Sequence, residues 1–73
     1  KYAVEILRSA QKSLARIQAE DRETISDAIR KLGDNPRQAG TRKLTGREAW
    51  RLRVGRYRVI YQVFDDRLVV SVI

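Results

Sequence analysis

Residues 50–61 read WRLRVGRYRVIY, and this stretch decides the fold. Trp50, Leu52 and Val54 alternate with Arg51 and Arg53, which is the two-residue period of a strand with one buried face. The sequence therefore predicts a strand whose apolar side faces a core and whose arginines face away from it.

The next two residues predict a hairpin. Gly55 can supply the positive φ of a two-residue type II′ turn with Arg56. The cross-strand pairs expected from this turn are Val54 with Tyr57, Arg53 with Arg58, Leu52 with Val59, and Arg51 with Ile60. The core face then gains Tyr57, Val59, Tyr61 and Val63. Arg58 joins Arg51 and Arg53 on the opposite face.

Like charges placed directly across a strand pair repel one another, so folding alone gives no reason to choose two arginines at such positions. A bound anion would stabilise such a pair and so explain why two arginines stand there. The alternative is a solvated sheet face whose charges only discourage aggregation at an edge.

Charge is concentrated in the second half of the chain. The 73 residues carry a net charge of +7, with a pI near 10.6. Residues 1–36 hold seven basic and six acidic side chains, whereas residues 37–73 hold nine and three. Between Arg37 and Arg58, Glu48 is the one acid among eight basic residues. Nucleic acid or an acidic protein is the natural complement of such a surface.

Composition excludes several kinds of chemistry. The chain has no cysteine and no histidine, which removes disulfides, thiolate nucleophiles, zinc sites and histidine-based acid–base schemes. We expect no cofactor or metal, and a reducing, cytoplasmic setting fits. No apolar run approaches the length that spans a membrane. A chain of this size predicts one domain over residues 1–73, and the absence of methionine indicates trimmed ends.

The first half predicts one strand and two helices. Tyr2–Leu7 alternates like a strand, and Ser9 is a candidate cap for a helix with an apolar stripe. A second helix is expected to begin near Glu20 or Asp21 and to end at Gly33. The apolar positions of the two helices are Ala10, Leu14 and Ile17, then Ile25, Ala28, Ile29 and Leu32.

The second half predicts an antiparallel meander. A short extended piece is possible at Thr41–Leu44, followed by strands at Trp50–Val54, Tyr57–Phe64 and Arg67–Ile73. In the last strand, Leu68, Val70 and Val72 are expected to face the core. The fold class is α+β, with two helices packed on one face of the sheet.

Two other groups of residues have competing interpretations. Asp65 and Asp66 are expected to form a tight turn, because adjacent side chains point apart and no third carboxylate is near to complete a metal site. Trp50, Tyr57 and Tyr61 share the parity of the core positions, which favours packing over the stacking of nucleic-acid bases.

The pattern KL.G...WR.RVG.YRV.Y, from Lys43 to Tyr61, together with NPR at residues 35–37, resembles the RelE/ParE superfamily of bacterial toxins and its RelE branch in particular. The resemblance covers essentially the whole chain. It implies the toxin of a type II toxin–antitoxin pair, a ribosome-dependent endoribonuclease that cleaves messenger RNA in the A site through attack by the ribose 2′-hydroxyl.

The resemblance also implies roles for individual residues. The basic positions that stabilise the phosphate under attack match Arg51, Arg53 and Arg58, and the further RNA-binding positions are expected at Arg42, Lys43, Arg47 and Arg56. The partners expected are a cognate antitoxin and messenger RNA on the ribosome, with contacts to 16S ribosomal RNA, and neither a membrane nor a small-molecule cofactor.

Two alternatives come from other classes. The ParE branch acts on DNA gyrase and is not a nuclease, and a module that binds RNA or a partner without catalysis is the other. The RelE branch also takes an arginine and a tyrosine from a C-terminal tail, which would follow Ile73. We therefore expect the chain as it stands to bind an antitoxin without cleaving messenger RNA.

Overall fold

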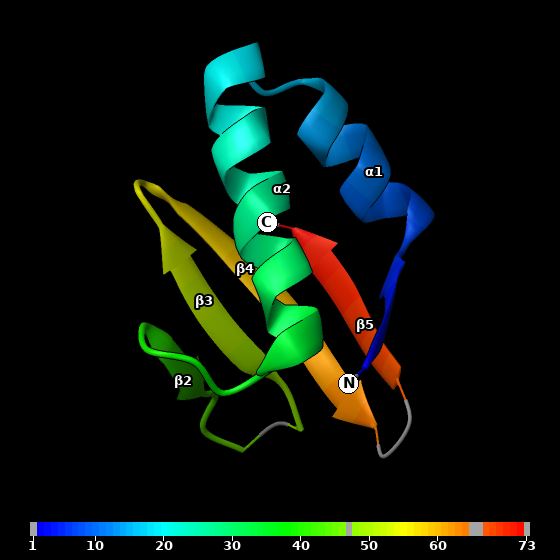
Figure 1. Ribbon diagram of the computed structural model, residues 1–73, viewed down its shortest axis with the longest axis vertical. Coiled ribbons are helices and arrows are strands. Elements are labelled where there is room, and N and C mark those ends of the chain that lie inside the picture. The colour runs from blue at the N-terminus through cyan, green and yellow to red at the C-terminus, as the bar shows by residue number, and fades with distance from the viewer. Residues whose placement is uncertain (1, 47, 65–66, 73) are drawn as a thin grey trace.

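The computed structural model describes residues 2–46, 48–64 and 67–72. Its elements in chain order are β1 (Ala3–Ile6), α1 (Arg8–Ala15), α2 (Ala19–Asp34), β2 (Thr41–Lys43), β3 (Trp50–Val54), β4 (Tyr57–Phe64) and β5 (Arg67–Val72) (Figure 1). The α+β class and the predicted order of elements are confirmed.

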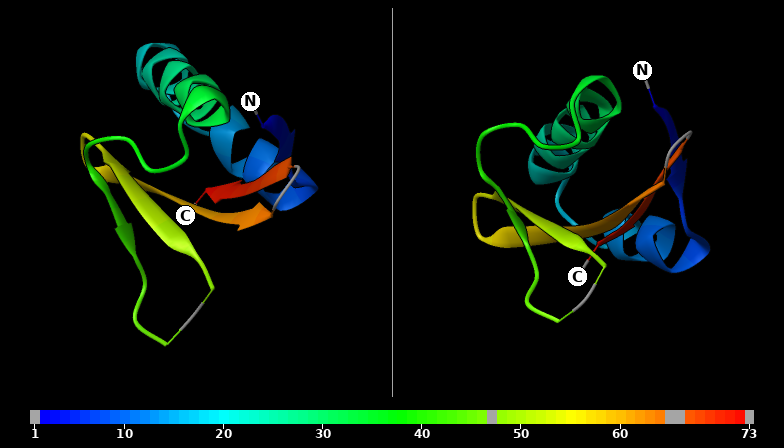
Figure 2. Two further views of the ribbon diagram at one scale, coloured as in Figure 1. Left: turned by 60° about the horizontal axis from the view of Figure 1, so that its bottom comes forward. Right: turned by 90° about the horizontal axis from the view of Figure 1, so that it is seen from below.

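Within the described residues, the strands form one twisted sheet in the order β1-β5-β4-β3-β2 (Figure 2). β3, β4 and β5 make the antiparallel meander that the alternation predicts. β2 adds to the outer edge of β3, and β1 pairs in parallel with β5 at the opposite edge. This parallel pair joins the two ends of the sequence, so no local pattern could predict it.

The β3–β4 hairpin has the predicted register. Gly55 has a φ of 59°, which the first central position of a type II′ turn requires. Arg56 at the second position does not have a positive φ, because among the described residues only glycines do. Between β4 and β5, Val63 pairs with Leu68, Tyr61 with Val70 and Val59 with Val72, so these positions of β5 have the predicted parity of the core positions. The expected Asp65-Asp66 turn and the end of the last strand at Ile73 lie outside the described residues.

The helix boundaries differ from the prediction at two points. α1 begins at Arg8, so Ser9 lies inside the helix and does not cap it. Gly33 lies inside α2 and is not its exit, because the helix continues to Asp34. The reason for glycine at this position is close packing, since a β-carbon there would lie 3.0 Å from Val4 Cγ2. The Gly33 carbonyl also accepts a hydrogen bond of 2.8 Å from the Tyr2 backbone N–H.

Both helices contribute to one core on the sheet face that carries the apolar residues of β3 and β4. The buried members of this cluster are Ala10, Leu14, Ile25, Ile29, Leu32, Leu52, Val59 and Tyr61. α2 lies across the strands, and α1 packs beside β5 (Figure 1). The predicted packing of two helices on one sheet face is confirmed. Neither described helix is long and apolar enough to span a membrane.

Candidate nucleic-acid interface

The hairpin brings Arg53 and Arg58 directly opposite one another on β3 and β4. Both side chains are exposed, and Arg51, two residues earlier on the same face of β3, is half-buried. The face opposite the core therefore carries the three arginines that the alternation selects.

A fourth arginine joins this group from the neighbouring strand. The register of β2 on β3 pairs Arg42 with Arg51, so the two side chains leave the sheet on the same side. We call Arg42, Arg51, Arg53 and Arg58 the arginine face. Sequence reasoning missed the pairing of Arg42 with Arg51, because β2 is too short to show a period. The possible extended piece at Thr41–Leu44 was the one local signal for it.

Arg51 has the least favourable environment of the four. Its Nε is buried and has no hydrogen-bond partner within the described part of the chain. Desolvation lowers the pKa of Arg51 below the ordinary arginine value, and the nearby charges of Arg53, Arg42 and Arg58 lower this pKa further. Anions bound beside these guanidinium groups would relieve the repulsion between them.

A cavity of about 190 Å³ opens at the turn end of the arginine face. Its lining consists of Arg53, Gly55, Arg56, Tyr57 and Arg58. Three arginines line this concave spot, and planar guanidinium forks match the oxygens of a phosphate, so the cavity is suited to one anion.

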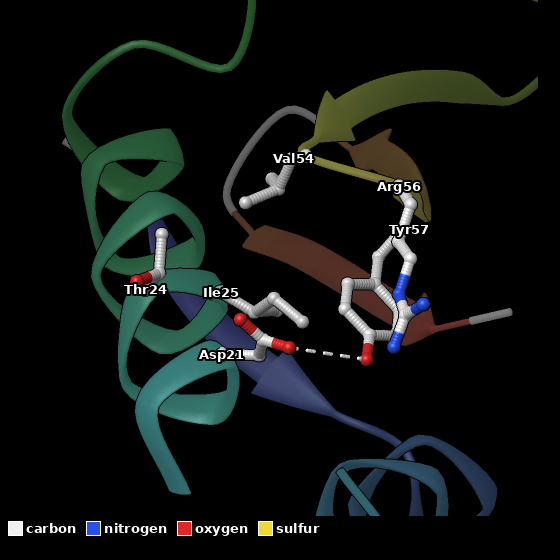
Figure 3. A pocket seen from close by; sticks show the side chains of 7 residues that line it. Asp21, Thr24, Ile25, Val54, Arg56 and Tyr57 are labelled. Atoms are coloured by element: carbon white, nitrogen blue, oxygen red, sulfur yellow. Dashed lines mark hydrogen bonds between the residues drawn. The ribbon is translucent and has the colours of Figure 1, made fainter. Parts of the chain in front are cut away.

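Arg56 also lines a neighbouring pocket of about 340 Å³ on the helix side of the hairpin (Figure 3). There the Arg56 guanidinium carbon lies 5.6 Å from the centre of the Tyr57 ring, and the Tyr57 hydroxyl donates a 3.4 Å hydrogen bond to Asp21 Oδ2 (Figure 3). The pKa of Arg56 lies above the ordinary arginine value. The main cause is a hydrogen bond with Tyr57, and the charges of Tyr57 and Asp21 raise this pKa further. These contacts attach the hairpin tip to the first turn of α2.

The structure does not bring all the predicted RNA-binding residues together. Lys43 pairs with Trp50 and so leaves the sheet on the core side, where its Nζ lies 3.4 Å from Glu48 Oε2. Arg47 lies outside the described residues. Arg42 and Arg56 are thus the two of these four predicted residues that the structure places beside the arginines of β3 and β4.

The aromatic residues pack as predicted. Tyr61 is buried, and its hydroxyl donates a hydrogen bond to the Pro36 carbonyl oxygen. Trp50 and Tyr57 are half-buried against the same core. The guanidinium carbon of Arg37 lies 5.2 Å from the centre of the Trp50 ring, so that ring already has a cationic neighbour. Tyr57 also lines the cavity at the turn end of the arginine face, together with Arg53 and Arg58.

Comparison with known proteins identifies the class to which this chain belongs. Residues 4–73 match the family described as "ParE toxin of type II toxin-antitoxin system, parDE". The chain therefore belongs to this toxin family, within the RelE/ParE superfamily. No curated protein sequence gives a significant match.

Solved structures extend the likeness to the RelE branch. A free double-arginine variant of the Escherichia coli toxin RelE is 27% identical with a TM-score of 0.75, and the match covers 99% of this chain and 78% of that one. In the intact E. coli RelBE toxin–antitoxin complex the identity is 26% and the TM-score 0.78, over 99% and 90% of the two chains. The RelBE2 complex of Mycobacterium tuberculosis, 19% identical with a TM-score of 0.81 over 97% and 90%, shows the shared fold. The resemblance to the RelE/ParE superfamily is confirmed.

Proposed function

We propose that this type II toxin is a ribosome-dependent endoribonuclease that cleaves messenger RNA in the A site. The observation that carries the proposal is the direct pairing of Arg53 with Arg58 beside a cavity lined by three arginines. The E. coli RelE structures, at 26–27% identity over nearly the whole chain, support the same branch.

The proposed chemistry follows from where charge develops. Attack of a ribose 2′-hydroxyl on the neighbouring phosphorus builds negative charge on the phosphoryl oxygens. Guanidinium groups already held by a sheet stabilise that charge more than the ground state, because they need little rearrangement during the reaction. We assign this role to Arg53 and Arg58 at the attacked phosphate and to Arg51, whose charge acts on that phosphate from two residues earlier on β3. RNA binding at the margins of the site is assigned to Arg42, Lys43, Arg47 and Arg56.

The arginines supply charge and not proton transfer. Arginine remains protonated in proteins, so no member of the arginine face can act as the general base. The Tyr61 hydroxyl donates a hydrogen bond to the Pro36 carbonyl oxygen within the core, and the Tyr57 hydroxyl donates one to Asp21 Oδ2 on the helix side. The groups that move the proton in the proposed reaction are thus not among these two tyrosines.

An antitoxin is the expected protein partner. The solved structures similar to this chain include three toxin–antitoxin complexes, RelBE of E. coli, RelBE2 of M. tuberculosis and RelB–RelE of Methanococcus jannaschii. We propose that the cognate antitoxin neutralises the basic surface, because a net charge of +7 favours a partner with acidic segments.

Inhibition of DNA gyrase is the second candidate, and the match of residues 4–73 to the ParE family favours it. Two assays of the full-length protein separate the candidates. Primer extension on translated messages detects A-site cleavage, and a supercoiling assay detects inhibition of gyrase. The proposal predicts new primer-extension stops on translated messages and unchanged supercoiling. Blocked supercoiling with intact messages would contradict the endoribonuclease proposal and support inhibition of DNA gyrase.

A further inference from the structure

The arginine face consists of two cross-strand pairs on three adjacent strands. Arg53 pairs with Arg58 between β3 and β4, and Arg42 pairs with Arg51 between β2 and β3. The two members on β3 are two residues apart, which corresponds to about 7 Å along an extended strand. The pairs are also displaced by one strand spacing, about 4.8 Å, across the sheet.

The two pairs do not form one binding site. The cavity at the turn end is lined by Arg53 and Arg58 together with Arg56, and neither Arg42 nor Arg51 contributes to it. A single phosphate in that cavity therefore leaves the second pair without a ligand. Two anions held at neighbouring positions satisfy both pairs.

The second pair has the properties of an incomplete anion site. Among the described residues, Arg51 Nε has no acceptor although it is buried, whereas most buried N–H groups in proteins are hydrogen-bonded. Neither Arg42 nor Arg51 forms an ion pair in the part of the chain that the structure describes. A phosphate placed between the two guanidinium groups would accept hydrogen bonds from their terminal N–H groups and screen the repulsion between the pair.

We propose that Arg42 and Arg51 form a second phosphate subsite, which holds the phosphate next to the one bound by Arg53 and Arg58. This inference rests on the proposed RNA substrate. An extended single strand carries its phosphates at a regular spacing comparable to that of the two arginine pairs, whereas the acidic side chains of a protein partner have no such fixed spacing. The two subsites together set the register of the RNA on the sheet.

The test uses a short single-stranded RNA in which each phosphate in turn is replaced by a neutral methylphosphonate. Binding of each RNA is measured by fluorescence anisotropy for the wild type, Arg42→Ser and Arg58→Ser. Arg8→Ser is the matched control, because Arg8 is an exposed arginine at the start of α1. Circular dichroism establishes that all four proteins are folded.

We expect the wild type to lose about threefold to tenfold in affinity when either of two adjacent phosphates is neutral. Arg42→Ser should become insensitive to one of these positions and Arg58→Ser to the other, while Arg8→Ser behaves like the wild type. Sensitivity at a single position, removed by Arg58→Ser and unaffected by Arg42→Ser, would overturn the second subsite and leave the proposed RNA substrate standing. Absence of RNA binding by the wild type would overturn both. Binding of the antitoxin that depends on Arg42, with RNA binding that does not, would assign the pair to the protein partner.

Discussion

Arg53 and Arg58 face one another across β3 and β4, and the turn at Gly55 puts them there. A shift of this register by one residue would move every side chain of one strand to the other face of the sheet. The two-residue turn thus fixes the core positions and the arginine positions together. Two positive charges held in this geometry cost stability in the free protein and become favourable when an anion lies between them.

RNA binding should weaken steeply as salt is added. Each phosphate neutralised on a single strand contributes roughly −0.7 to the slope of log affinity against log salt concentration, so two adjacent phosphates on the arginine face give a slope of about −1.4. Titrations of a single-stranded RNA at several salt concentrations measure this slope. Affinity that stays constant from low to moderate salt would mean that the arginine face does not bind phosphates.

Arg53→Thr should separate stability from activity. Relief of the repulsion with Arg58 should leave the free domain as stable as the wild type, or more stable by about a few tenths of a kcal/mol. Loss of a charged donor should lower the cleavage rate of the full-length protein by about 100-fold or more. Thermal unfolding and single-turnover cleavage measure the two effects, with Arg8→Thr as the control that changes neither appreciably. A large loss of stability would show instead that Arg53 has a structural role.

Tyr61→Phe should destabilise the fold. The substitution removes a buried hydroxyl and leaves the Pro36 carbonyl oxygen without its donor, which costs about 1–3 kcal/mol. Tyr57→Phe is the matched control, because the Tyr57 hydroxyl makes a longer, part-buried hydrogen bond of 3.4 Å to Asp21. Urea denaturation should therefore give a larger loss for Tyr61→Phe. Equal losses would contradict the importance assigned to the buried contact.

The difference in unfolding free energy between the wild type and Tyr61→Phe should become smaller in alkali. Burial raises the pKa of Tyr61 in the folded protein, whereas an unfolded tyrosine ionises near pH 10. Above about pH 10 the unfolded state thus loses its tyrosine proton first, and stability falls as the pH rises toward the folded pKa. The difference in unfolding free energy between the two proteins should narrow over this range. A difference that stays constant would contradict this prediction. An equal narrowing between the wild type and Tyr2→Phe would contradict it as well.

Local sequence patterns predict the parts of this fold that depend on neighbouring residues. The alternation around Gly55 is sufficient for the hairpin register, and the same reasoning selects Arg51, Arg53 and Arg58. It does not predict the parallel pairing of β1 with β5, or the place of Arg42 opposite Arg51, because both depend on contacts between distant segments. It also misplaces Gly33, whose role is the close approach of α2 to β1 and not the termination of a helix.

The positions of Lys43 and Arg56 show a second limit of pattern reading. A count of basic residues treats them alike, yet the pairing of Lys43 with Trp50 directs it to the core side of the sheet. Arg56 sits in the turn, where its ring contact with Tyr57 places it between two pockets. Net charge predicts a basic surface, but only the strand register determines which charges share a face.

Nuclear magnetic resonance of the arginine Nε–Hε groups tests most directly whether RNA phosphates bind the arginine face. During titration with a short single-stranded RNA, we predict that the signals of Arg51, Arg53 and Arg58 shift together and saturate at the same RNA concentration. The signals of the exposed helix arginines Arg8, Arg22 and Arg30 should remain in place. Shifts confined to the helix arginines, or no shift of the three sheet arginines at saturating RNA, would contradict binding of RNA phosphates to this face.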